Sequence, residues 1–122
     1  MTEKTKGIIG WILTGLISVP FLGAAVGKLI KSEEALKMAG IFGIDADTYQ
    51  LLGGLELVAL VLFIIPRTGI AGAILLISFM GGAIATHLQH NLPVIAPVIV
   101  QSLLVIVAAY RFPELRSRLL KA

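Results

Sequence analysis

Long apolar runs, almost free of charged residues, dominate the chain. They cover residues 7–28, 48–66, 68–88 and 92–110. Each run is about as long as the ~20 residues that a helix needs to cross the hydrocarbon core of a bilayer. Because no water reaches that core, each run must satisfy its own backbone hydrogen bonds, and runs of this length do so as helices, whereas barrel strands are about half as long. The pattern predicts an all-α fold, a four-transmembrane-helix bundle.

The connection between the first two runs is the only long one, and it mixes apolar with charged residues. Ser32 followed by Glu33 and Glu34 is typical of a helix start. Gly40 and Gly43 are typical of helix ends. We predict a short amphipathic helix between the first and second spans, lying along the outer surface of the membrane.

Small residues and prolines indicate how the helices pack. Four pairs of small residues occur at a spacing of four, namely Gly23 with Gly27, Gly69 with Ala73, Gly81 with Ala85, and Gly82 with Thr86. This spacing lets helix backbones approach closely in lipid, so we expect these pairs at helix contacts. We expect Pro20 to bend the first helix. Pro93 and Pro97 are expected in the first turns of the fourth helix, where a missing N–H matters less.

The composition agrees with a membrane protein. Hydrophobic residues make up 57% of the 122 residues and charged residues 14%, against roughly 25% charged residues in soluble domains. These values exclude an ordinary soluble domain and a disordered chain, both of which need more polar residues. We therefore interpret residues 1–122 as a single integral membrane domain. The absence of cysteine excludes thiol–disulfide catalysis, thiolate zinc sites and iron–sulfur clusters.

The basic residues are unevenly placed along the chain. Seven of the ten lie near the N-terminus, between the second and third runs, or in the C-terminal tail: Lys4, Lys6, Arg67, Arg111, Arg116, Arg118 and Lys121. By the positive-inside rule, both termini are expected in the cytoplasm, which agrees with an even number of spans. The first run also resembles a secretory signal, but its apolar core is longer than the usual ~7–15 residues, so we expect it to remain as a span. The basic residues are too scattered for a nucleic-acid surface, so we expect no nucleic-acid partner.

Glu56 is the most informative residue, because it lies near the middle of the second apolar run with no basic residue nearby on its own helix. An unpaired carboxylate at that depth costs several kcal/mol by most scales, so we expect it to be protonated, paired or in contact with water. Tyr49, Gly53 and Glu56 fall on one stripe of a helix, and this stripe should face the interior of the bundle. The alternative is that Glu56 is only a hydrogen-bonded clamp between helices.

The other spans also place polar side chains in the outer half of the bundle. Lys28 ends the first span and could turn inward to Glu56 or extend to the surface. His87 ends the third span, and Gln101 with Ser102 lies within the fourth. We predict that Lys28, Glu56, His87 and Gln101 form a small polar pocket, supported by Tyr49, Gly53 and Ser102.

We expect neither a metal site nor a catalytic residue. The two histidines and Glu56 do not have the spacing of a recognisable ligand motif. The sequence contains no Ser-His-Asp arrangement, glycine-rich phosphate loop or HExxH motif. His90 is expected to be a loop residue. An enzymatic activity of the isolated chain is therefore weakly supported by the sequence.

Four segments of the sequence resemble the DoxX-like family of small four-helix membrane proteins. They are GAAVGKL (23–29), GGLELVALVLFIIPRTGIAGA (53–73), GGAIATHL (81–88) and AAYRFPEL (108–115). The Lys, Glu and His that are typical of the family match Lys28, Glu56 and His87. We expect the cytoplasmic (inner) membrane of a bacterium and no built-in cofactor. The resemblance implies an association with quinone-linked or membrane redox chemistry in some relatives. The cysteines that certain redox-associated relatives use are missing here, so their disulfide chemistry is not expected.

Three hypotheses for the function follow. In the first, the polar pocket binds a small ligand or a quinone-like head group, or relays protons for a partner redox complex in the bilayer. In the second, the chain is a non-catalytic membrane scaffold subunit whose polar residues only hold the helices together. In the third, it is a small proton-coupled transporter, which would require a homodimer because four short helices leave little room for a conduit.

Overall fold

The computed structural model describes residues 2–120, and Lys121 lies outside them. Helices account for most of this part of the chain, and no strand occurs in it. The elements are α1 (Glu3–Leu29), α2 (Glu33–Phe42), α3 (Ala46–Ile64), a 3₁₀ turn η1 (Pro66–Thr68), α4 (Gly69–Gln89), α5 (Ile95–Arg111) and α6 (Pro113–Leu120). The all-α prediction is confirmed.

The long helices coincide with the apolar runs of the sequence. Three of the described helices are long and apolar enough to cross a membrane, or four spans result if α5 and α6 count as one bent span. The two helices of that pair differ in direction by 109°. On its own, α5 has 17 residues, at the lower limit of the ~17–25 residues of transmembrane helices. α1 continues without a break through Pro20.

The start of α5 differs from the prediction. Pro93 lies in the connection before the helix, and only Pro97 is in its first turn. After α4, the chain turns at Asn91, which has a φ of 58°, and the Leu92 N–H donates to the His87 carbonyl at 2.8 Å. Because residues 91–93 form the turn that ends α4, they are not available to begin α5.

The short helix predicted between the first two spans is present as α2 (Glu33–Phe42). The Ser32 side chain accepts a hydrogen bond from the Ala35 N–H and caps the helix start. At the other end, Gly43 adopts a left-handed conformation with a φ of 69°, which glycine accommodates without strain. Gly40, the other expected end, lies within the helix instead. The buried face of α2 carries Ala35 and Ala39.

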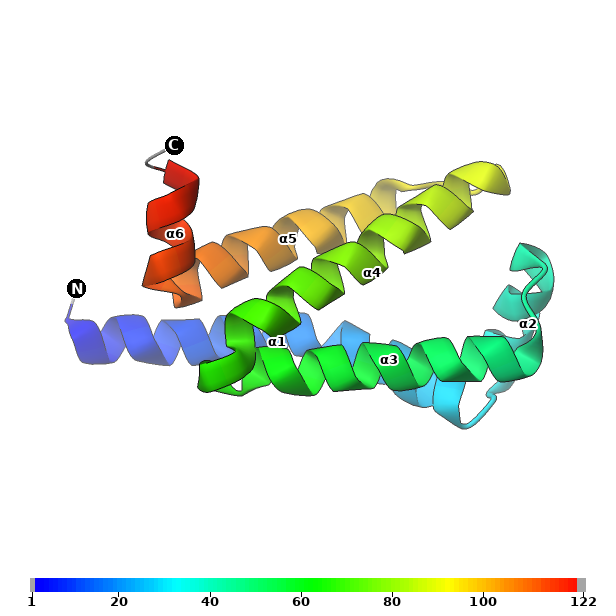
Figure 1. Ribbon diagram of the computed structural model, residues 1–122, viewed down its shortest axis with the longest axis horizontal. Helices are drawn as coiled ribbons and strands as arrows, with labels where there is room; N and C mark the ends of the chain where they lie inside the picture. The colour runs from blue at the N-terminus through cyan, green and yellow to red at the C-terminus, as the bar shows by residue number, and fades with distance from the viewer. Residues whose placement is uncertain (1, 121–122) are drawn as a thin grey trace.

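The long helices pack in the order α1, α3, α4 and α5, with α5 returning to α1. Figure 1 shows α1 beside α3 and α4 beside α5, with the two pairs close together near the N-terminus and α6 and diverging towards α2. The core contains Phe21, Leu60, Phe63, Leu76 and Leu104, each at most 3% exposed. A cavity lined by residues of α3 and α4 lies at the end where α2 is found, and Lys28, Glu56 and His87 are among its lining residues.

Candidate functional site

A buried ion pair joins α1 to α3. The Lys28 ammonium donates to Glu56 Oε1 at 2.8 Å, and the two side chains are only 12% and 3% exposed. Gly53 allows this approach, because a Cβ added there would lie 2.5 Å from Lys28 Cβ and 3.0 Å from the Ala25 carbonyl oxygen. Of the two orientations considered for Lys28, the structure therefore has the inward one.

Aromatic rings surround the ammonium group of Lys28. Its Nζ lies 5.4 Å from the ring centroid of Tyr49 and 5.4 Å from that of Phe79. Such cation–π contacts partly replace the water that a buried ammonium loses. The Lys28 ammonium has three N–H donors, of which Glu56 takes one. A polar group of a ligand could therefore also accept a hydrogen bond from Lys28.

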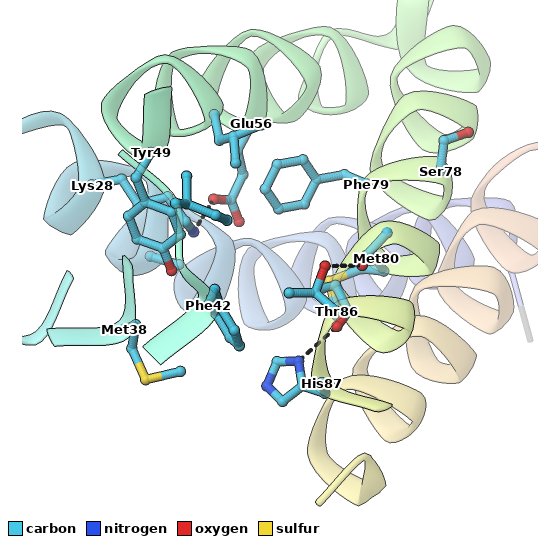
Figure 2. A pocket seen from close by; sticks show the side chains of 15 residues that line it. Lys28, Met38, Phe42, Tyr49, Glu56, Ser78, Phe79, Met80, Thr86 and His87 are labelled. Atoms are coloured by element: carbon cyan, nitrogen blue, oxygen red, sulfur yellow. Dashed lines mark hydrogen bonds and ion pairs between the residues drawn. The ribbon is translucent and has the colours of Figure 1, made fainter. Parts of the chain in front are cut away.

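The ion pair lines a cavity of about 450 Å³. Figure 2 shows the Lys28–Glu56 contact on one side of it, with Phe79 beside the carboxylate. The lining is mostly apolar and comes from α1 to α4 and the connection after α2. It consists of Ala24, Lys28, Met38, Phe42, Ile44, Tyr49, Leu52, Glu56, Ser78, Phe79, Met80, Gly82, Ala83, Thr86 and His87. A cavity of this size and character can hold a small, mainly apolar molecule.

His87 lines the same cavity but does not join the ion pair. Its Nδ1 lies 2.6 Å from the Ala83 carbonyl oxygen. Because a carbonyl oxygen only accepts, Nδ1 donates and Nε2 is left to interact with a ligand. The imidazole packs edge-on against the Phe42 ring, with centroids 5.3 Å apart. Figure 2 shows Phe42 between His87 and the Lys28–Glu56 pair. The polar groups of the cavity are therefore separated by an aromatic ring.

Gln101 and Ser102 are not brought to the cavity, so the expectation that all four spans contribute to one pocket is wrong for α5. Gln101 Nε2 donates to the Ile77 carbonyl on α4 at 3.2 Å. The Ser102 hydroxyl donates to the Val98 carbonyl of its own helix at 2.9 Å. α4 and α5 stay in contact while α3 and α4 diverge (Figure 1), so the cavity opens on the α3 side of α4. Gln101 is therefore a contact between helices.

Among the other predicted residues, Tyr49 lines the cavity. Gly53 supports the site from the α1–α3 contact. His90 caps the end of α4, with Nδ1 at 2.9 Å from the Thr86 carbonyl oxygen and its ring 5.7 Å from that of Phe42.

The sequence analysis did not identify two aromatic side chains that line the cavity, Phe42 and Phe79. Phe42 comes from α2 and reaches the cavity because α2 folds across the open end of the bundle. The sequence carried a signal for Phe79, because Phe79, Ala83 and His87 follow one another at four-residue spacing and share one face of α4. Nothing in the sequence alone places Phe42 against that face.

No group of three His, Asp or Glu side chains within residues 2–120 is arranged to hold a metal ion. The polar side chains at the cavity are instead one ammonium, one carboxylate, one imidazole, one phenol and the hydroxyls of Ser78 and Thr86. This set suits hydrogen bonding to an organic polar group and the exchange of protons with it.

Comparison with known proteins gives one family. A sequence model with the description DoxX-like family matches residues 12–110. No significant match to a curated protein or to a solved structure accompanies it. The matched range contains both members of the ion pair and His87.

Proposed function

The chain belongs to the DoxX-like family, and from this premise we propose that it binds a small lipid-soluble molecule with a quinone-like head group in the cavity between α1 and α4. The chain is a membrane protein with long apolar helices. We further propose that α5 is its fourth span, that both termini face the cytoplasm, and that the membrane is the cytoplasmic membrane of a bacterium. The uneven distribution of lysine and arginine supports this orientation.

The observation that supports binding is the buried Lys28–Glu56 pair in the wall of an otherwise apolar cavity. Removing two charges from water costs several kcal/mol per ion, and well-packed hydrophobic residues often replace such a pair without loss of stability. Stability alone is therefore a weak reason to keep the pair. Its position at the cavity favours a role in contacting a polar group there.

A quinone ring matches the chemistry of the lining. Its flat apolar ring would pack against the aromatic side chains of Phe42 and Phe79. One ring oxygen would accept a hydrogen bond from the Lys28 ammonium, and the other, once reduced to a quinol hydroxyl, would donate to His87 Nε2. Reduction of a quinone to a quinol takes up two electrons and two protons. The electrons would come from a partner redox complex in the membrane and the two protons from water, with the Lys28–Glu56 pair passing the protons to the quinone oxygens.

The Glu56→Gln variant tests this proposal. Glutamine keeps the shape of the side chain and one hydrogen-bond acceptor but removes the negative charge. The Lys28 ammonium is then held less firmly in the orientation that contacts a ligand. We expect the variant to bind a short-chain quinone on the order of ten-fold more weakly, and to lose any lipid-soluble molecule that the wild type retains. Native mass spectrometry of protein released gently from its own membrane, with and without added quinone, measures both effects and the number of subunits.

Gln101→Leu is the matched control, because it removes a polar contact between helices outside the cavity. We expect it to cost about 1 kcal/mol of stability and to leave quinone binding unchanged. If both variants bind like the wild type, or if the wild type is empty and binds no quinone, the scaffold hypothesis is favoured. Exclusively monomeric protein would contradict the transporter hypothesis.

A further inference from the structure

The opposite end of the molecule, where α1 begins and α5 ends, has a second cavity of about 590 Å³. Its lining includes Lys6, Trp11, Tyr110, Arg116 and two carboxylates, Glu3 and Glu114. Figure 1 shows α6 leaving this end across the direction of the long helices. In a bilayer that the long helices cross, α6 therefore runs along the surface, and the cavity lies at the level of the lipid head groups.

Contacts within the protein hold α6 in this direction. Arg111, at the end of α5, donates to the carbonyls of Phe63 and Ile64 at the end of α3. Phe112 is buried and packs against Phe63, with ring centroids 6.3 Å apart. Pro113 then begins α6, since proline lacks an N–H and favours the first position of a helix. The Arg111 guanidinium therefore serves the packing of the helices. The side chains of Lys6, Arg116 and Arg118 are left to contact the membrane surface.

The side chains of α6 suit a membrane surface. At about 100° per residue, Leu115 and Leu119 form one stripe, and Arg116 and Arg118 lie about 80° to either side of its centre. Leu115 packs against the core, whereas Leu119 is 53% exposed. Both arginines are exposed. An apolar stripe flanked by basic side chains is typical of a helix that lies at the boundary between acyl chains and head groups.

The acidic residues of the cavity do not cancel these charges. Glu3 is 3.6 Å from Lys6 and is itself 94% exposed. Glu114 lies in the first turn of α6, where a negative charge favours the helix start. Arg116 donates to the Tyr110 carbonyl at 3.2 Å with one nitrogen, and its guanidinium has further donors. Arg118 has no ion-pair partner within residues 2–120.

We propose that this end of the molecule is a binding site for the phosphate head group of an anionic phospholipid, with Arg116 of α6 and Lys6 of α1, which both line the cavity, as its basic contacts. The acyl chains of this lipid lie along the apolar surface beside Trp11. The site is separate from the cavity at Lys28 and Glu56, and it requires only that the protein is embedded in the membrane.

Trp11 provides the measurement, because it is the single tryptophan of the chain and lines the cavity. The protein is placed in phosphatidylcholine nanodiscs that contain an equal mole fraction of brominated phosphatidylglycerol or brominated phosphatidylcholine, with the same brominated acyl chains. Bromine quenches tryptophan fluorescence on contact, so the ratio of quenching by the two lipids reports the preference for the anionic head group. We expect stronger quenching by phosphatidylglycerol, and a smaller preference at high salt.

The variant Arg116→Gln should reduce this preference about five-fold, the effect of one basic residue near an anionic surface. Lys6→Gln tests the contribution of α1 independently of α6. Arg67→Gln is the matched control, because Arg67 is exposed in η1, is among the basic residues expected on the same side of the membrane, and does not line the cavity. Equal quenching by the two lipids in the wild type, or an equal loss in Arg67→Gln and Arg116→Gln, would overturn the proposal.

Discussion

Lys28→Met should lower the free energy of unfolding by about 3–5 kcal/mol, because it leaves the Glu56 carboxylate buried without its partner. The Glu56 side chain is only 3% exposed, and its salt bridge is to Lys28 at 2.8 Å. Equilibrium unfolding in detergent micelles at neutral pH measures the loss. The loss should shrink at acidic pH, where a protonated Glu56 no longer carries an unpaired charge.

Lys31→Met is the matched control, since Lys31 also forms an ion pair, with Asp47 at 2.5 Å, but at the surface. The side chains of that pair are 39% and 80% exposed, so we expect a much smaller loss, or none, because water screens exposed ion pairs. A similar loss in the two variants, or no change in Lys28→Met at either pH, would contradict a buried charged pair.

The double variant Lys28→Met with Glu56→Leu separates stability from function. Because both charges are removed together, we expect it to recover most of the stability that Lys28→Met loses. If the pair serves a ligand, this stable double variant should still fail to bind the short-chain quinone. Normal binding by the double variant would show that the ligand does not depend on the pair.

The sequence alone predicted the fold and identified Lys28 and Glu56 for the same physical reason, and it left open whether Lys28 turns inward to Glu56. A bilayer imposes long apolar helices, and any charge within them must find a partner. Lys28 and Glu56 were therefore recognisable before their contact was known. The capping residues Ser32 and Gly43 also marked α2 correctly, because helix caps depend on local chemistry.

The remainder of the site depends on how each helix is rotated and tilted, which hydropathy does not record. Gln101 was grouped with His87 as a polar side chain in the outer half of the bundle, but its side chain faces the Ile77 carbonyl on α4. Phe42 belongs to a surface helix by sequence, and only the folding of α2 across the open end brings it to His87. In lipid, apolar side chains on every face of a helix are acceptable, so an apolar pattern does not identify the inward face.

Hydropathy also does not show which glycines lie at close helix contacts, and one such glycine, Gly72, is expected to matter strongly for stability. Gly72→Ala should cost about 3 kcal/mol, at the upper end of the usual range for overpacking. A Cβ at this position would overlap the backbone of Phe63 and Leu62 on α3. Backbone atoms cannot move aside as the end of a side chain can, so α3 and α4 would have to separate. The separation would open the core around Phe63 and Leu76, both 0% exposed. Equilibrium unfolding in detergent micelles measures the loss.

Gly23→Ala is the control, because Gly23 belongs to one of the pairs at four-residue spacing and a Cβ there would meet nothing within 4 Å. The same holds for Gly82, so the spacing was wrong as a marker of contact at both positions. We expect Gly23→Ala to be neutral or to stabilise the helix by up to about 1 kcal/mol. Equal destabilisation by Gly23→Ala and Gly72→Ala would mean that the small-residue pairs pack in the membrane against something other than this chain. A loss confined to Gly72→Ala would locate the close helix contact at the α3–α4 turn, away from the cavity that opens towards α2.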